Sequence, residues 1–317
     1  MALAQTPLTL FTALDSWQWD WSTTLVVAVL GGVYLRGNAA AARSGTAVGS
    51  SRVCCFLGVG LGMWVLATMS FVGVYADTLF WVRALQVVLL LIVVPFGLAL
   101  GKPVTVLREG GSPARRQRID SILASKAARI ATYPATTSIA MLATPWLLYL
   151  TPWYRHALEN ESVDLLTRLV LVAVGFGYFY SRVQVDPVPR RYSQGISLLI
   201  TVAETLGDGV LGVVVWLGPT IAADYYTGLG RTWGPSRATD QTIGAGLLWI
   251  LADVLGLPFL FVLMRAFRVD ERRSAAHVDA ELDSGQPDTN PADAQPVTSA
   301  LWWENDPQLQ ERFRRNR

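Results

Sequence analysis

The chain has 317 residues and a formal net charge of +2; 52% of its residues are hydrophobic and only 16% are charged. A soluble domain carries about 25% charged residues, so this composition argues against a soluble globular protein. The small net charge argues against a nucleic-acid-binding protein.

Cysteine and histidine are too sparse for a disulfide framework or a zinc site. The two cysteines, Cys54 and Cys55, are adjacent, and the two histidines, His156 and His277, lie far apart. Neighbouring cysteines on a helix point about 100° apart, so a single metal site cannot easily use both. No phosphate-binding glycine-rich loop or nucleophile motif is present, and we expect a protein that is not an enzyme.

Apolar segments indicate an all-α, polytopic membrane protein with seven transmembrane helices, because a span needs about 20 apolar residues. The first and fifth segments are short for a span. Glycines such as those of Gly58–Gly62 indicate close helix packing. The seven segments are Trp21–Leu35, Val53–Tyr75, Leu79–Leu100, Ile130–Leu150, Ser162–Tyr180, Ile196–Leu217 and Ile243–Phe267.

Positive charge gathers in the loops after the odd-numbered segments. Cytoplasmic loops are rich in Lys and Arg, so we predict an external N-terminus and a cytoplasmic C-terminus. The residues concerned are Arg36, Arg43, Arg52, Lys102, Arg108, Arg115, Arg116, Arg118, Lys126, Arg129, Arg182, Arg190, Arg191, Arg265, Arg268, Arg272 and Arg273. Tryptophans such as Trp17, Trp19, Trp21 and Trp216 then fall near the outer face, where tryptophan favours the headgroup level.

Three parts follow from this topology: an outer N-terminal segment (1–20), a transmembrane domain (21–267) and a cytoplasmic, mostly disordered tail (268–317). We expect no cleavable signal, because no Lys or Arg precedes Arg36. Residues 112–129 are basic and amphipathic, which predicts a helix lying on the inner leaflet. The stretch Trp302–Pro307 is either a short docking motif or part of a tail that binds nothing.

Ionisable residues inside the segments are the candidate functional residues, because charges in a membrane are costly. They are Arg83, Asp164, Arg168, Glu204, Asp208 and Asp253. Asp164 and Arg168 are four residues apart, which suits a helical ion pair. Glu204 and Asp208 share one helix face, so a cation lies between them or one is protonated. We predict one ionic cluster near the outer face that joins the third, fifth and sixth segments. A structural ion-pair network, proton or ion passage, and cation binding remain alternatives for it.

Several stretches together resemble the CtaG-type cytochrome c oxidase assembly factors. The likeness is carried in order by Tyr75–Phe80, Pro95–Leu107, Leu148–Leu158, Gly175–Pro187, the pattern Asp240-Gln241…Gly246…Trp249…Asp253, and Arg268–Arg273. It covers roughly residues 15–275 and implies seven helices in the orientation predicted above. It also implies a role in oxidase maturation, by helping copper to reach the catalytic subunit.

The resemblance places the family's intramembrane copper-binding histidines at positions where this sequence has none. Those positions hold Arg83, Val87, Asp164, Arg168 and Asp208. Arginine stays protonated and cannot bind copper. We therefore expect no metal and no cofactor in this chain, although copper is handled in the family.

Two functions follow as hypotheses. The first is a metal-free scaffold or interaction protein for oxidase assembly, whose partners are the lipid bilayer and oxidase subunits or other respiratory assembly proteins. The second is a proton, ion or small-solute transporter that uses Glu204, Asp208 and Asp253. The sequence has only two lysines, Lys102 and Lys126, among many Ala, Val, Gly and Arg. That bias is typical of a GC-rich bacterial genome, so we expect a multi-pass protein of the bacterial plasma membrane.

Overall fold

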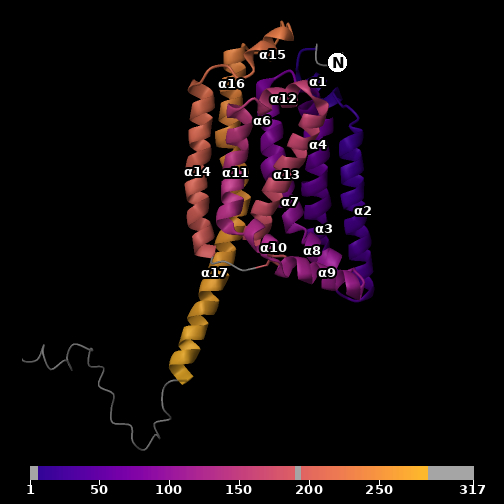
Figure 1. The fold of residues 1–317 in the computed structure, drawn as a ribbon, viewed down its shortest axis with the longest axis vertical. Helices are drawn as coiled ribbons and strands as arrows, with labels where there is room; N and C mark the ends of the chain where they lie inside the picture. The colour runs from indigo at the N-terminus through magenta and orange to yellow at the C-terminus, as the bar shows by residue number, and fades with distance from the viewer. Residues whose placement is uncertain (1–5, 190–193, 285–317) are drawn as a thin grey trace, which may run out of the picture. The chain divides into compact units, whose positions relative to one another are not determined.

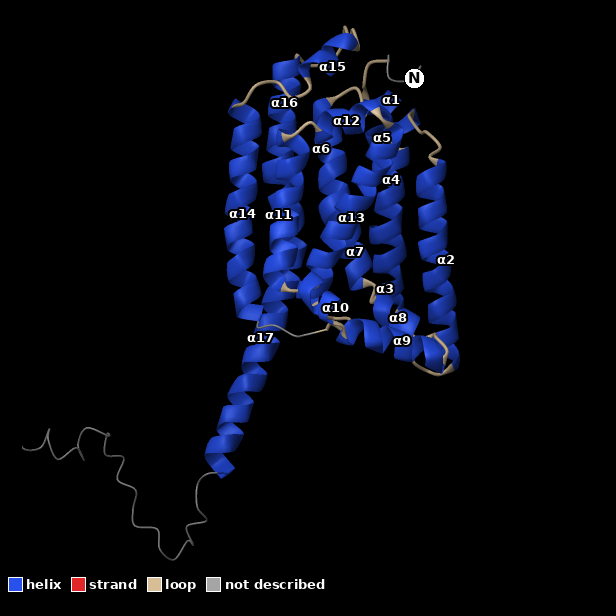
Figure 2. Cartoon of the chain, in the orientation of Figure 1, coloured by secondary structure: helices blue, strands red, loops and turns tan. Residues whose placement is uncertain are grey.

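The structure is a computed structural model that describes residues 6–189 and 194–284. The side chains at 194–203, 205 and 208, and most of those after residue 265, lie outside this description. Every regular element among the described residues is a helix, so the all-α prediction is confirmed (Figure 2).

The helices follow one another with short connections. In chain order they are α1 (Leu10–Asp15), α2 (Trp21–Arg43), α3 (Ser50–Cys54), η2 (Cys55–Gly62), α4 (Met63–Met69), α5 (Phe71–Tyr75), α6 (Phe80–Val88), η3 (Leu89–Val93), α7 (Val94–Leu100), α8 (Pro103–Glu109), α9 (Pro113–Ala124), α10 (Lys126–Ala131), α11 (Pro134–Leu150), α12 (Trp153–Glu159), α13 (Glu161–Val183), α14 (Gln194–Leu217), α15 (Ala223–Gly228), α16 (Arg237–Gly246), η4 (Leu247–Leu251) and α17 (Ala252–Ser284). The η elements are π-helical stretches within longer helices.

Five helical stretches of the described chain are long and apolar enough to cross a membrane. They are Trp21–Arg43, Ser50–Met69, Phe80–Glu109, Glu161–Val183 and Arg237–Arg265. They correspond to the first, second, third, fifth and seventh predicted segments. The fourth and sixth segments correspond to α11, which has 17 residues, and to α14, which has 24 residues but is described only in part.

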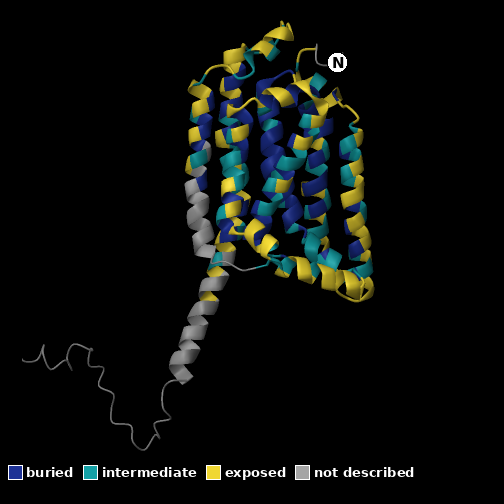
Figure 3. Cartoon of the chain, in the orientation of Figure 1, coloured by how far each residue is buried: buried dark blue, intermediate teal, exposed yellow. Residues whose placement is uncertain are grey.

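The third predicted segment forms the centre of the bundle (Figures 1 and 3). In its most apolar stretch 72% of residues are buried, against 17% in Trp21–Arg43. α7 packs against η2 and α13, while α6 packs against α16. The long helix α2 lies at the periphery, against α8 and α4.

Glycine lets η2 and α7 approach each other closely. A Cβ atom on Gly97 would lie 2.5 Å from the backbone nitrogen of Gly60, and one on Gly60 would lie 2.7 Å from Leu98 Cδ2. Small residues allow such approaches between membrane helices. The predicted packing role of the glycines therefore holds at Gly60, whereas Gly58 has only ordinary contacts.

The two ends of the bundle differ (Figure 1). One end carries α1, α12 and α15, and the other carries α8, α9 and α10. The single basic helix predicted for 112–129 is in fact two, because the chain breaks at Ser125, whose side chain caps α10 by accepting from the Ala128 N–H at 3.1 Å. No residue of α9 or α10 is buried.

The chain divides into a compact unit up to Phe267 and a second unit from Arg268. This division falls where the predicted transmembrane domain ends. Helix α17 continues to Ser284, so residues 268–284, the first part of the predicted tail, are helical. The predicted disorder around 284–296 and the Trp302–Pro307 stretch lie outside the described residues.

Candidate functional site

Arg83 and Asp164 form the centre of a buried ionic group. Together with Asp20 and Arg168 they are named here the Asp164 cluster. Arg83 lies one turn into α6 and Asp164 in the first turn of α13, at the same end of the bundle. Arg83 Nη2 donates to Asp164 Oδ1. Only 2% of the Arg83 side chain and 8% of the Asp164 side chain are exposed, so water contributes little to their solvation.

Arg168 extends the Asp164 cluster to the start of α2. Its Nη2 donates to Asp164 Oδ2, one helical turn before it, and its Nη1 donates to Asp20 Oδ2 at 2.8 Å. Asp20 is also the N-cap of α2, accepting from the Ser22 N–H at 2.9 Å and from the Thr23 hydroxyl at 2.8 Å. A single carboxylate thus caps one helix and pairs with another.

The environment of Asp20 favours its charged form. Burial alone would raise the pKa of Asp20, but hydrogen bonds from Ser22 and Thr23 and the charge of Arg168 outweigh it, so the pKa lies below its usual value.

The Asp164 cluster is balanced in charge, with two guanidiniums and two carboxylates. A third carboxylate, that of Asp77, lies 4.0 Å from Arg83 but is 59% exposed. Gln86 holds the other terminal nitrogen of Arg83: its side-chain oxygen accepts from Arg83 Nη1 at 2.9 Å. The side-chain nitrogen of Gln86 donates in turn to the Ala67 carbonyl at 2.8 Å. The two Nη nitrogens of Arg83 are therefore held in one arrangement, whereas its buried Nε has no hydrogen-bond partner among the described residues.

Three of the six predicted residues meet in this cluster, namely Arg83, Asp164 and Arg168. Val87, on the same helix as Arg83, is 2% exposed and belongs to the hydrophobic core. Its side chain has no atom that could bind a metal. The donor set at these positions does not fit copper, because guanidinium nitrogens carry protons and have no free lone pair.

The predicted single cluster is wrong in one respect: Glu204 pairs with Arg182 instead of with Arg83 or Arg168. Arg182 donates to Glu204 Oε2 at 2.9 Å and to Oε1 at 3.1 Å. The Tyr178 hydroxyl donates to Oε2 at 2.6 Å, and Ser138 Oγ accepts from Arg182. We name Ser138, Tyr178, Arg182 and Glu204 the Glu204 cluster.

The physical reason lies in helix depth. Arg182 is next to last in α13, about five turns beyond Asp164. Glu204 lies in the first half of α14, the helix that follows. Arg182 adjoins a polar stretch, which predicted a loop position for it. Its full burial could not be found from hydropathy, although an acid in the next segment was a signal for a partner.

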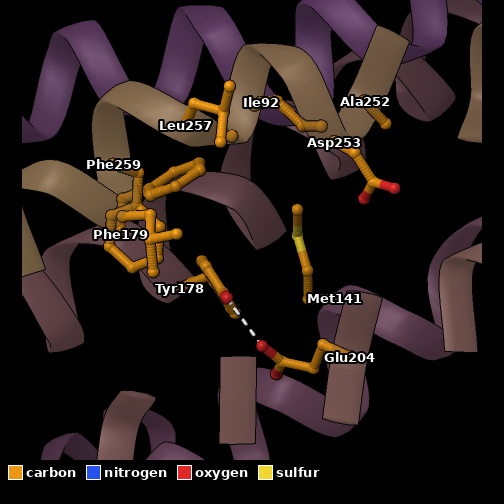
Figure 4. Close-up of a pocket in the computed structure, with 11 residues that line it drawn as sticks. Ile92, Met141, Tyr178, Phe179, Glu204, Ala252, Asp253, Leu257 and Phe259 are labelled. Atoms are coloured by element: carbon orange, nitrogen blue, oxygen red, sulfur yellow. Dashed lines mark hydrogen bonds between the residues drawn. The ribbon is translucent and has the colours of Figure 1, made fainter. Parts of the chain in front are cut away.

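Asp253 and Glu204 face a common cavity of about 240 Å³ between α11, α13, α14 and α17 (Figure 4). Met141, Tyr178 and Phe259 also line it. In Figure 4 both carboxylates point into the space, with the Met141 side chain between them. The side chain of Asp208 lies outside the described residues, so its predicted place beside Glu204 stays a prediction.

Comparison with known proteins gives relatives but no solved fold. The chain is 26% identical over 292 residues to uncharacterized proteins of Mycobacterium bovis and Mycobacterium tuberculosis, covering 89% of this chain and 44% of theirs. A protein of Mycobacterium leprae, also uncharacterized, is 25% identical over 278 residues, covering 84% and 42%. The chain thus spans less than half the length of these curated relatives. No solved structure matches it.

A family match covers every residue of the two clusters except Asp20. The cytochrome c oxidase caa3 assembly factor family, Caa3_CtaG, matches residues 32–269. This stretch includes α6, α13 and α14, which carry Arg83, Asp164, Arg168 and Glu204. The match agrees with the resemblance seen in the ordered sequence motifs. The chain therefore belongs to the family of cytochrome c oxidase caa3 assembly factors.

Proposed function

We propose that this protein is a metal-free scaffold for oxidase assembly in the bacterial plasma membrane. It spans the membrane seven times, with the N-terminus outside and the C-terminus in the cytoplasm. Its partners are subunits of the oxidase or other respiratory assembly proteins. The Asp164 cluster carries the metal-free part of the proposal, since the salt-bridged residues Arg83, Asp164 and Arg168 stand at three of the positions at which the family resemblance places copper-binding histidines.

The electrostatics of that cluster disfavour a cuprous cargo. The guanidiniums of Arg83 and Arg168 present protonated nitrogens, and their charges compensate the only carboxylates in the cluster. Breaking such a buried pair to free a carboxylate costs about 3–5 kcal/mol. The geometry favours a fixed joint between α2, α6 and α13 over a site that takes up and releases an ion.

The distribution of surface residues supports the proposed orientation. Near the N-terminal end, Trp17, Trp19 and Trp21 are 52%, 65% and 77% exposed, as expected for a tryptophan belt at the headgroup level. The opposite end carries the basic helices α9 and α10. Segments rich in positive charge face the cytoplasm, so this end of the bundle is the cytoplasmic one in the proposed orientation.

Two measurements on one set of strains test the scaffold. Deletion is expected to lower the amount of assembled oxidase, and Asp164→Asn, which weakens the joint, is expected to lower it in proportion to the loss of folded protein. Added copper should not restore assembly in either strain. Restoration by copper would contradict the scaffold, as would a tight, stoichiometric copper site on the purified protein.

A second candidate is transport of protons, ions or a small solute through the cavity lined by Glu204 and Asp253. The observation that favours it is that two carboxylates face one space and the described residues provide a cation, Arg182, for only one of them. Proteoliposomes test it directly: flux that is lost in Asp253→Asn would support transport. Equal flux in protein-free vesicles would exclude it.

A further inference from the structure

A polar cavity of about 480 Å³ lies beside α15 and the first residues of α16, at the end of the bundle that carries α1. None of its lining residues belongs to either cluster described above. Two guanidiniums, those of Arg231 and Arg237, line it together with the hydroxyl residues Thr227, Thr232 and Ser236. The only carboxylate paired with either guanidinium in the described residues is Asp240, so one positive charge remains in excess.

Arg231 is held in place but leaves one donor unused. Its side chain is 10% exposed, and Nη2 donates to the Pro235 carbonyl at 2.9 Å and to Asp240 Oδ2 at 3.2 Å. Its guanidinium carbon lies 5.5 Å from the Trp233 ring centroid. Nη1 is buried and has no hydrogen-bond partner among the described residues. A buried donor without an acceptor is costly, and an oxyanion in the cavity would satisfy it.

The loop geometry keeps the space beside Nη1 open. Gly234 has φ +76°, and a Cβ atom there would lie 2.7 Å from Arg231 Nη1. The N-terminus of α16 also adjoins the cavity, and the aligned peptide dipoles of a helix favour an anion at that end. Arg237, at the first position of α16, donates to the Thr227 hydroxyl and is exposed, so its other nitrogens are available.

An apolar groove shares a wall with this cavity. The groove has a volume of about 380 Å³ and is lined by Leu8, Leu79, Trp81 and Ile243 together with Trp233, Gly234 and Pro235, of which the last three also line the polar cavity. Ile243 is 42% exposed. A ligand that filled both spaces would carry an anionic group next to a hydrocarbon chain.

We propose that the polar cavity binds the phosphate of a phospholipid and that the adjoining groove holds the start of one acyl chain. Phosphate suits the cavity because guanidinium nitrogens donate to its oxygens in charge-assisted hydrogen bonds. The lipid comes from the leaflet at the N-terminal end of the bundle. Free phosphate shares the head-group chemistry but leaves the groove unfilled, so the two sources can be separated.

The test uses the full chain purified in a non-ionic detergent, with binding followed by native mass spectrometry and calorimetry. Three probes are titrated: dioctanoyl phosphatidylglycerol, dioctanoylglycerol and inorganic phosphate. Phosphatidylglycerol is expected to bind about tenfold or more tightly than either of the others, because each lacks one half of the recognition. If dioctanoylglycerol bound as tightly as phosphatidylglycerol, the assignment of the cavity to phosphate would be wrong. If inorganic phosphate bound as tightly, the assignment of the groove to an acyl chain would be wrong.

Variants locate the site. Arg231→Gln and Arg237→Gln are each expected to weaken phosphatidylglycerol about tenfold, as for the loss of one charge-assisted hydrogen bond. Arg155→Gln is the control, because Arg155 is an exposed arginine in α12 at the same end and pairs with Glu159. If Arg231→Gln does not fold, the affinity of Arg237→Gln for phosphatidylglycerol tests the location of the site. Wild-type affinity in Arg237→Gln would overturn the site.

Discussion

Arg182 donates to both carboxylate oxygens of Glu204, at 2.9 and 3.1 Å, from a side chain that is fully buried. The pair joins the end of α13 to α14, and its Glu204 also lines the cavity that Asp253 faces. Because both charges are removed from water, each depends on the other for compensation.

The first prediction concerns this pair. Arg182→Met leaves the Glu204 carboxylate buried without its cation, and is expected to lower the free energy of unfolding by about 3–5 kcal/mol. Adding Glu204→Gln to the same chain should recover part of the loss. Unfolding of the purified protein in detergent by denaturant measures both.

Arg155→Met is the matched control, since the pair of Arg155 with Glu159 is exposed at 51% and 40%. Exposed pairs contribute about 0–1 kcal/mol. An equal loss in Arg155→Met and Arg182→Met would show that the buried pair has no special role.

The second prediction compares two acids that face Arg83. Asp164 is buried and bonded to Arg83 and Arg168, whereas Asp77 lies 4.0 Å away with 59% of its side chain exposed. Asp164→Asn should cost about 3–5 kcal/mol, and Asp77→Asn about 0.5 kcal/mol or less. Thermal denaturation of the two variants in parallel measures both losses of stability. A larger loss in Asp77→Asn than in Asp164→Asn would contradict the prediction.

The third prediction uses glycine packing. Gly97→Ala would place a Cβ atom 2.5 Å from the Gly60 nitrogen and 2.7 Å from the Val59 carbonyl carbon, both backbone atoms. Overpacking of this kind costs about 1–3 kcal/mol. Gly177→Ala, with nothing within 4 Å of the added atom, should be neutral or stabilise the helix by up to about 1 kcal/mol. Equal shifts of the melting temperature in Gly97→Ala and Gly177→Ala would contradict the close approach of the two helices at Gly97.

The fourth prediction concerns pH. The pKa of Asp20 is lower in the folded protein than in the unfolded chain, so the charged carboxylate stabilises the folded state. This stabilisation is fully present above the unfolded pKa of about 3.9 and is lost as the pH falls through the lower folded pKa. Asp20→Asn removes this titration. The stability difference between wild type and Asp20→Asn should be constant near neutral pH and shrink below about pH 4. A difference that grows on acidification would contradict the assigned direction.

Helix positions followed well from the sequence because hydropathy alone sets them. The third segment was predicted as Leu79–Leu100, and the helices from α6 to α7 cover Phe80 to Leu100. The second segment was predicted as continuous to Tyr75, but the structure breaks it at Ser70, which has extended ψ and caps α5 through its hydroxyl. A serine within an apolar run carries little hydropathy signal, so local capping went unseen.

Partners were harder to predict than positions. The i,i+4 spacing of Asp164 and Arg168 specifies their contact, since one helical turn separates them. Asp20 and Arg168 are 148 residues apart, and Arg182 and Glu204 lie on different helices, so only the folded bundle brings them together. Linear spacing gives the depth of a charge but not the helix that faces it.

The bond between Asp20 and Arg168 has a consequence for the order of biosynthesis. Helix α2 leaves the ribosome early, but the cation that pairs with its capping residue is made 148 residues later. Other contacts of α2 involve residues made earlier: the buried Tyr34 hydroxyl donates to the Gly101 carbonyl at 2.7 Å, and the Tyr34 ring stacks on Phe56. The start of α2 therefore gains its ionic partner only after α13 has been made, whereas the rest of the helix can pack earlier.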